Sequence, residues 1–205
     1  MSRRRSAGAP RTGTPADLLV VGLGNPGEGY AATRHNAGAA AVEVLADRHG
    51  GHLRRRRGLP ALTDEVRIEG RRVALAFPRT YMNVSGEAVR KLTRRFGIDD
   101  LRRLVVIHDE LDLPTGRVQV RVGGGPAGHN GLRSIRDHLR ATSFVRIRIG
   151  IGRPPSAAAG ADYVLSRPAP ADREALATAA GRAADAAEVI ATDGVERAMN
   201  TFNVR

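Results

Sequence analysis

Histidine and asparagine residues occur in four glycine-bearing segments of this 205-residue chain, and a fifth, acidic segment contains aspartate; each lies where an apolar run gives way to a loop. His35 lies in the segment Thr-Arg-His-Asn-Ala-Gly, and Asp109 lies in His-Asp-Glu-Leu-Asp-Leu-Pro. A histidine takes up a proton near neutral pH, and a buried carboxylate fixes its tautomer and stabilises its charged form. We therefore expect His35 to act as a general base that Asp109 supports.

Three asparagines stand in the other segments of this kind. Asn25 lies in Gly-Leu-Gly-Asn-Pro-Gly, Asn83 in Tyr-Met-Asn-Val-Ser-Gly, and Asn130 in Gly-His-Asn-Gly. Each asparagine alone is typical of a turn. Three uncharged amides near one base, however, suit an ester or amide substrate, whose developing oxyanion needs donors. Because the chain has no cysteine and no Gly-x-Ser-x-Gly, these features predict a hydrolase whose nucleophile is water.

The sequence shows no pattern for a metal or a nucleotide cofactor. His49, His52 and His138 lie outside the polar segments, and the spacings give neither an HExxH helix nor a carboxylate cluster. Residues 22–27 resemble part of a dinucleotide-binding loop. An Asn-Pro pair interrupts that loop, and no ribose-binding acid stands about 20 residues further on. We therefore expect no metal and no other cofactor.

Positive charge is the strongest global feature of the chain, which has 33 basic and 21 acidic residues and a net charge of +12. A biased genome explains the preference for arginine over lysine but not this excess, so we expect a nucleic-acid partner. Arg121 and Arg148 fall on predicted strands beside the glycine-rich loop 123–131. Because arginine binds phosphate oxygens through two donors, the pair is a candidate phosphate site. A solvated strand face is the alternative.

Length and composition limit the class of protein. The length suits one domain, and no apolar run approaches the about 18 residues that indicate a membrane span. Residues 1–15 lack the apolar centre of a signal peptide, so we expect a cytoplasmic protein with no membrane partner. Residues 1–16 predict a disordered basic tail, followed by one catalytic domain at 17–205.

The order of apolar and helical patterns predicts the fold class. Apolar or alternating runs predict strands at 18–23, 62–68, 71–77, 104–107, 117–122 and 144–151. Helical spacing predicts helices at 37–49, 85–96, 132–139, 171–191 and 195–202, with loops at 54–57 and 154–161. This order predicts a single α/β domain with a mixed, mostly parallel twisted sheet flanked by helices. In such sheets the sites form at the ends of strands.

Six segments resemble, in order, those of the bacterial peptidyl-tRNA hydrolase family. They are Gly-Leu-Gly-Asn-Pro-Gly, Tyr-Ala-Ala-Thr-Arg-His-Asn-Ala-Gly, Thr-Tyr-Met-Asn-Val-Ser-Gly, His-Asp-Glu-Leu-Asp-Leu-Pro, Gly-His-Asn-Gly-Leu-Arg-Ser and Arg-Ile-Gly-Ile-Gly-Arg-Pro. The likeness runs from about Leu18 to Asn203. It implies a monomer that cleaves the ester between a peptide and the terminal ribose of tRNA, which recycles the tRNA.

The resemblance also implies a role for each matching residue. His35 matches the base and Asp109 its supporting acid, and Asn25, Asn83 and Asn130 match asparagines that hold peptide and water. Tyr30 matches a tyrosine at the tRNA end of the cleft, and Met82 and His129 match cleft-wall positions. Arg121 and Arg148 match a pair that clamps the tRNA 5′-phosphate. Ala127 departs from the family, which more often has glycine there, so we expect Pro126 and Ala127 to stiffen the loop. The alternative function is a non-catalytic RNA-binding relative with the same fold.

Overall fold

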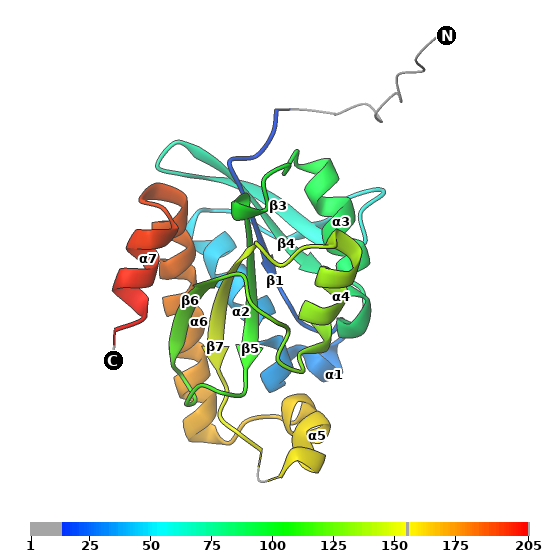
Figure 1. Ribbon diagram of the computed structural model, residues 1–205, viewed down its shortest axis with the longest axis vertical. Coiled ribbons are helices and arrows are strands. Elements are labelled where there is room, and N and C mark those ends of the chain that lie inside the picture. The colour runs from blue at the N-terminus through cyan, green and yellow to red at the C-terminus, as the bar shows by residue number, and fades with distance from the viewer. Residues whose placement is uncertain (1–13, 155, 205) are drawn as a thin grey trace.

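The computed structural model describes residues 14–154 and 156–204, which form a seven-stranded sheet with helices on both faces (Figure 1). The order of strands across the sheet is β2-β3-β4-β1-β5-β7-β6. The strands are β1 (Leu18–Gly22), β2 (Arg54–Arg55), β3 (Ala61–Ile68), β4 (Arg71–Pro78), β5 (Leu104–Glu110), β6 (Val118–Val122) and β7 (Val145–Gly150).

Parallel pairing is confined to the four central strands. β1 pairs in parallel with β4 and β5, and β5 pairs in parallel with β7, whereas β2, β3 and β6 join through antiparallel pairs. Every residue of β1 and β5 is buried, as the continuous apolar runs of central strands require. The predicted class, a single α/β domain with a mixed sheet flanked by helices, is confirmed.

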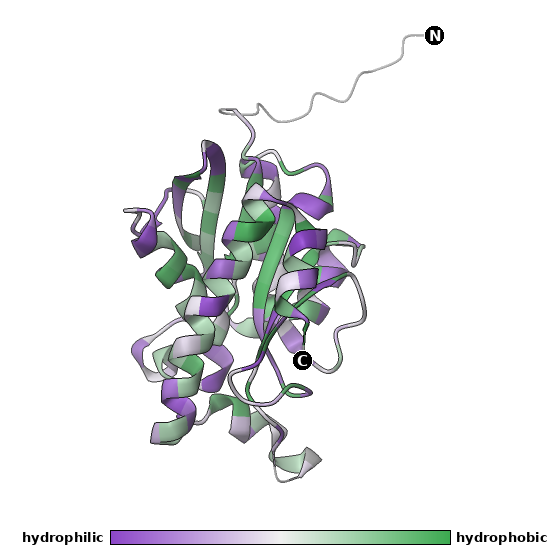
Figure 2. Ribbon diagram, turned by 90° about the vertical axis from the view of Figure 1, so that its left-hand side faces the viewer, coloured by the Kyte–Doolittle hydropathy of each residue, from purple (hydrophilic) through white to green (hydrophobic). Residues whose placement is uncertain are grey.

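Helices α2 (Ala37–Arg48), α6 (Pro170–Thr192) and α7 (Val195–Phe202) cover one face of the sheet, and α3 (Ser85–Arg95) and α4 (Asn130–Leu139) cover the other (Figure 1). Small side chains bring α6 close to the layer beneath it, since Ala179, Ala183 and Ala187 have no exposed surface. The sheet lies between these layers, and its apolar strands appear green between helices of mixed polarity in Figure 2. The central strands are therefore packed into a core on both faces of the sheet.

The hairpin predicted between β3 and β4 is present. Glu69 and Gly70, its two central residues, both have positive φ angles, of 48° and 79°. A two-residue turn of this primed type matches the right-handed twist of the strands. The hairpin places β4 parallel to β1, and the segments that follow Pro78 and Gly22 therefore begin at the same, carboxyl-terminal end of the parallel strands.

Three short elements differ from the sequence prediction. Arg54–Arg55, predicted as a loop, pairs with β3 as strand β2. The segment 154–161, also predicted as a loop, leads into a 3₁₀ turn and helix α5 (Gly160–Leu165), and helix α1 (Glu28–Ala31) was not predicted. These elements hold two, six and four residues, and such lengths are too short to show a period in the sequence.

The start of the described chain is packed against the sheet. Residues 1–13 of the expected tail lie outside the described residues, but Ala16 is buried and its amide donates to the carbonyl of Phe96. The packed part of the chain therefore includes Ala16. Among the helices of residues 14–154 and 156–204, none is long and apolar enough to cross a membrane.

A side chain is hydrogen-bonded along the outer edge of β6. Asn203, which follows α7, accepts from the amide of Val120 at 2.8 Å and donates to its carbonyl at 2.9 Å. An asparagine amide offers the same donor and acceptor as a peptide group. Asn203 thus pairs with Val120 much as a residue of a neighbouring strand would.

Candidate active site

The predicted base and acid meet at the carboxyl end of the parallel strands. His35 lies in a 3₁₀ turn (Arg34–Asn36) before α2, and Asp109 is the penultimate residue of β5. The Nδ1 atom of His35 is 2.9 Å from both carboxylate oxygens of Asp109. Both residues are buried. The sequence placed Asp109 after a strand, whereas the structure extends the strand through it, which holds the carboxylate on rigid backbone.

A second histidine also binds Asp109, which the sequence did not predict. The Nε2 atom of His129 is 3.0 Å from Oδ1 of Asp109, and its Nδ1 accepts from the amides of Gly131 and Leu132. Because backbone amides only donate, Nδ1 of His129 carries no proton. The proton is therefore on Nε2 and is donated to Asp109. The first turn of α4 thus fixes the tautomer of His129.

Asp109 remains ionised between the two histidines. Burial raises the pKa of its carboxyl group, but the charges and hydrogen bonds of His129 and His35 outweigh burial and hold that pKa well below its usual range. An ionised carboxylate accepts the Nδ1 proton of His35. The lone pair of His35 Nε2 is then left for a proton from water, as a general base requires.

His35 and Asp109 line a pocket of about 290 Å³. The glycine-rich loop contributes one wall through residues 126–130, and α5 contributes another through Gly160, Ala161 and Val164. The pocket thus combines ionisable groups with small apolar side chains, as ligand sites commonly do. Helix α5 is a part of the site that the sequence did not reveal, because it lies in a segment that was predicted as a loop.

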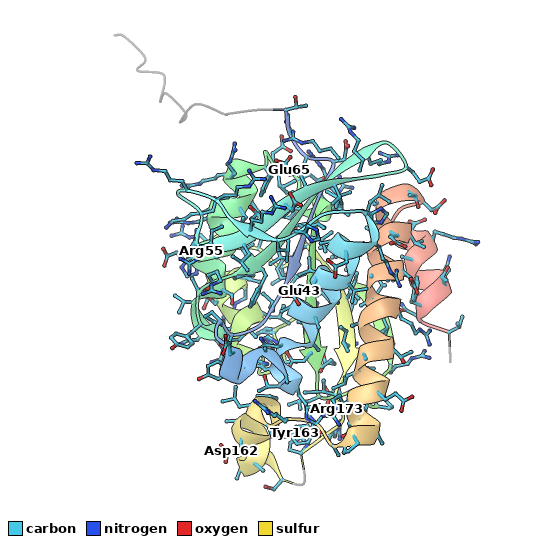
Figure 3. The ribbon with its side chains drawn as sticks, turned by 180° about the vertical axis from the view of Figure 1, so that it is seen from behind. Glu43, Arg55, Glu65, Asp162, Tyr163 and Arg173 are labelled. Atoms are coloured by element: carbon cyan, nitrogen blue, oxygen red, sulfur yellow. The ribbon has the colours of Figure 1, made fainter. Side chains whose placement is uncertain are left out.

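Arg34, the neighbour of the predicted base, holds α5 in place. Its guanidinium group lies 4.4 Å from the centre of the Tyr163 ring and donates to Ser166 at 2.7 Å and to Asp172 at 3.0 Å. The Tyr163 hydroxyl donates to the carbonyl of Ile151. In Figure 3, Tyr163 points inward from α5 while the neighbouring Asp162 points away from the protein. The turn that carries His35 therefore also positions the pocket wall.

The three predicted asparagines lie in different surroundings. Oδ1 of Asn25 accepts from the amide of Met82 at 2.8 Å, which leaves the Nδ2 donors of that amide for a ligand. Asn130 is the first residue of α4 and lines the pocket, whereas Asn83 is exposed and is not among the lining residues. Asn36, which the sequence did not single out, holds the backbone of Asn25 through two hydrogen bonds. The position of Asn36 directly after His35 is the feature of the sequence that could have marked it as part of the site.

Tyr30 and Met82 lie on the turns beside this cluster. Tyr30 belongs to α1, and its ring packs edge-to-face against that of Tyr81, with 6.5 Å between ring centres. Met82 is buried, and its backbone amide, rather than its side chain, contacts Asn25. Tyr81 is 60% exposed. The structure thus extends the polar site from the pocket toward an aromatic pair at the ends of β1 and β4.

The predicted arginine pair lies on β6 and β7, on the face of the sheet opposite to the one that α6 and α7 cover. Arg121 is exposed, whereas Arg148 donates to Glu110 at 3.0 Å and to Gln119 at 2.6 Å. Arg146 stands directly opposite Arg121 in the register of the two strands. Arg146 and Arg148 alternate onto the same face of β7, but Arg146 is buried, because the glycine-rich loop lies against it.

His108, the residue before Asp109, is almost completely buried. Its Nδ1 donates to the backbone carbonyl of Asp109 at 2.7 Å, and only 1% of its surface is exposed. Burial is the largest cause that lowers the pKa of His108 well below its ordinary value. His108 is therefore neutral in the folded protein at neutral pH, while in the unfolded chain it titrates near 6.5.

We expect His108 to make the protein less stable as the pH falls below about 6.5, where the unfolded chain binds one more proton than the folded chain. The stability that neutral His108 contributes is complete above that pH and is lost as the pH falls toward the lowered folded pKa. Denaturant titrations from pH 7 to pH 5 measure this slope. In His108→Asn the slope should be smaller by up to about 1.4 kcal/mol per pH unit.

His52→Asn is the matched control for this measurement, because the His52 side chain is 67% exposed. That variant should keep the slope of the wild type. An unchanged slope in His108→Asn would show that His108 does not carry the effect.

A histidine, a buried carboxylate beside it and amide donors lie at the carboxyl end of the parallel strands of a mixed sheet, an arrangement that suits a hydrolase. Residues 19–205 match the model of the family described as peptidyl-tRNA hydrolase. The chain belongs to the peptidyl-tRNA hydrolase family. The resemblance drawn from the six segments is confirmed.

Individual relatives agree over nearly the whole chain. A peptidyl-tRNA hydrolase of Chloroflexus aggregans is 49% identical over 185 residues, which are 90% of this chain and 98% of the relative. One of Frankia alni is 46% identical over 195 residues, covering 94% and 98% of the two chains. The crystal structure of peptidyl-tRNA hydrolase from Acinetobacter baumannii has a TM-score of 0.87 and 38% identity, and the match covers 94% of this chain and 98% of that one.

Proposed function

We propose that this chain hydrolyses the ester bond between the peptide and the terminal ribose of peptidyl-tRNA, with a water molecule that His35 activates. Membership of the family supports the substrate. The observation that carries the mechanism is the buried contact between His35 Nδ1 and the ionised Asp109. We also propose that the enzyme is a cytoplasmic monomer; one chain supplies all of the residues named for the site.

The reaction follows from this geometry in two proton transfers. Nε2 of His35 takes a proton from water as the water oxygen bonds to the ester carbonyl carbon. The C–O bond to the ribose then breaks, and the imidazolium returns the proton to the departing ribose oxygen. The products are free tRNA and a peptide carboxylic acid, which releases its remaining proton to solvent and becomes a carboxylate. Asp109 stabilises the imidazolium, and His129 keeps Asp109 in position.

The amides and aromatic rings are assigned to the substrate. We assign the Nδ2 donors of Asn25 and the side chain of Asn130 to the developing oxyanion and the attacking water, because Asn25 is oriented by Met82 and Asn130 lines the pocket. Asn83 and Tyr30 lie on the adjoining turns, where the peptide and the end of the tRNA would extend. Arg121 and Arg148 are assigned to the tRNA 5′-phosphate.

Single-turnover hydrolysis of an N-acetylated aminoacyl-tRNA by the purified protein, with no added metal, tests the proposal. We expect release of the N-acetylated amino acid and of intact tRNA. Tight tRNA binding without any cleavage would instead establish the alternative, a non-catalytic RNA-binding protein.

We expect the activity to survive a chelator. His35, Asp109 and His129 bring three potential ligand atoms within 4.8 Å of one another, so a metal is a real alternative. The tautomer of His129, however, is fixed by two backbone amides with its proton on Nε2, and this proton occupies the place of a metal ion. Turnover should be equal before and after treatment with EDTA and dialysis. A large loss that zinc restores would replace the water-activating pair with a metal site.

We expect Arg121→Ala to flatten the salt dependence of tRNA binding. Each lost phosphate contact reduces the slope of log affinity against log salt by about 1, and Arg121 is exposed on the open face. Arg121→Lys keeps the charge and should keep most of the slope. Arg182→Ala, an exposed position of α6 on the opposite side of the sheet, is the control for charge alone. Equal slopes in Arg121→Ala and the wild type would exclude the phosphate contact.

A further inference from the structure

Three arginines lie close together on the open face of β6 and β7. Arg121 pairs in register with Arg146, and Arg148 follows two residues later on the same face of β7. The facing carboxylate is Glu110, which is already bound to Arg148 at 3.0 Å. The group therefore carries three positive charges against one negative charge, and the central arginine, Arg146, is only 4% exposed.

Arg146 supports the glycine-rich loop rather than facing solvent. Its Nη1 donates to the carbonyl of Gly125 at 3.0 Å. Gly124 has a φ angle of 93°, which favours glycine, and a Cβ atom there would stand 2.5 Å from Nη2. Within residues 14–154 and 156–204, its Nε is buried without a hydrogen-bond partner. Arg146 is thus a buried cation whose main polar partner is the backbone of the loop.

The same loop carries His129 to the catalytic acid. The amide of His129 donates to the carbonyl of Pro126 at 2.8 Å, which closes the turn between the loop and α4. His129 then donates from Nε2 to Asp109. A continuous set of contacts therefore joins Arg146, Gly125, His129 and Asp109. If the loop lost its contact with Arg146, the hydrogen bond that positions the acid would be weakened.

Electrostatics makes this contact sensitive to an anion. Burial lowers the pKa of Arg146, and the charges of Arg148 and Arg121 lower it further. A cation that is buried without a counter-ion is held at a free-energy cost. A terminal phosphate group carries close to two negative charges and would offset the repulsion among the three arginines. Anion binding should therefore favour the arrangement in which Arg146 holds the loop.

We propose that Arg146 is a positioning residue that couples the binding of a terminal phosphate at Arg121 and Arg148 to the position of the glycine-rich loop. Through His129, the loop in turn positions the carboxylate of Asp109. The inference rests on the proposed hydrolysis of peptidyl-tRNA. It adds that the 5′-phosphate of the tRNA accelerates the chemical step in addition to strengthening binding. A ligand shifts an equilibrium only through its different affinity for two states, and the relief of repulsion at Arg146 supplies that difference.

The test compares N-acetylated aminoacyl-tRNA with and without its 5′-phosphate, the latter made by phosphatase treatment. Single-turnover rates are measured at saturating enzyme, so that binding does not limit them. For the wild type, we expect removal of the phosphate to slow cleavage about 5-fold or more, as in typical coupling between sites. In Arg146→Gln and Arg146→Lys, the ratio of the two rates should approach one, because lysine keeps the charge but lacks the planar donor pair.

Arg153→Lys is the matched control, because the Arg153 side chain is 75% exposed and pairs with Asp112 outside the group. It should keep the wild-type ratio. Thermal unfolding shows which variants fold, and the conservative lysine variant carries the test if Arg146→Gln does not. A purely structural role for Arg146 would slow both substrates equally. The inference is overturned by that result, or by a wild type whose cleavage rate is the same with and without the phosphate. A wild type that cleaves neither substrate would overturn the proposed function itself.

Discussion

His35→Ala is expected to lower the single-turnover rate of peptidyl-tRNA cleavage by about 10²- to 10⁴-fold, the range of general-base catalysis, while tRNA affinity stays nearly unchanged. His35 is the residue whose Nδ1 is bound to Asp109 and whose ring lines the pocket. Removing a neutral imidazole takes away almost no attraction to tRNA, because that attraction scales with the number of phosphates neutralised. Cleavage and equilibrium binding are therefore measured on the same preparation.

His52→Ala provides the control for the loss of a histidine, since that side chain is largely exposed and pairs only loosely with Asp47 at 3.7 Å. It should cleave at the wild-type rate. If His35→Ala retained most of its cleavage rate, the base would have to be another residue. If its tRNA affinity fell as steeply as its rate, His35 would instead serve the fold of the binding surface.

Asp109→Asn is expected to lower turnover by about 10²-fold or more through a change of tautomer. His129 has its proton fixed on Nε2 by the amides of Gly131 and Leu132. That proton needs an acceptor, so the asparagine must turn its oxygen toward His129 and its NH₂ group toward His35. Nδ1 of His35 would then have to accept, which moves the ring proton to Nε2. A histidine with Nε2 protonated cannot take a proton from water there.

Two measurements check this prediction. Single-turnover rates give the loss, and ¹⁵N chemical shifts of the imidazole rings report which nitrogen of His35 carries the proton. Asp185→Asn, a partly exposed position that binds Arg48, is the control. A slow Asp109→Asn enzyme with His35 in its wild-type tautomer would mean that the carboxylate acts by charge alone.

The contact between His35 and Asp109 could be predicted from the sequence, because the positions of both residues depend on strand ends. His35 and Asp109 follow or end buried apolar runs, and the parallel alignment of β1 and β5 brings such ends to one edge of the sheet. The fold class follows from the same patterns. The topology of the sheet brings His35 and Asp109 together, and the periodicity of strands and helices in the sequence predicts that topology.

The contacts made by the glycine-rich loop could not be predicted in this way. Its path depends on positive φ angles at Gly123, Gly124 and Gly128, and also at Ala127, where φ is 45°. Such angles are not periodic, so no pattern in the sequence predicted that the loop would bury Arg146. The left-handed conformation disfavours an L-residue by roughly 1–2 kcal/mol, which makes Ala127 a strained position. That this residue stiffens the loop stays a prediction.

The outer edges of the sheet are closed to a second chain in two different ways. At β6, the side-chain amide of Asn203 is hydrogen-bonded to both the N–H and the C=O of Val120. These two groups are therefore not available to a strand of another chain. At the opposite edge, β2 consists of Arg54 and Arg55, which are both exposed, and Arg55 lies at the rim in Figure 3. Two copies brought together along this edge would place like charges side by side. The fold therefore resists edge-to-edge aggregation by hydrogen bonding on one side and by repulsion on the other.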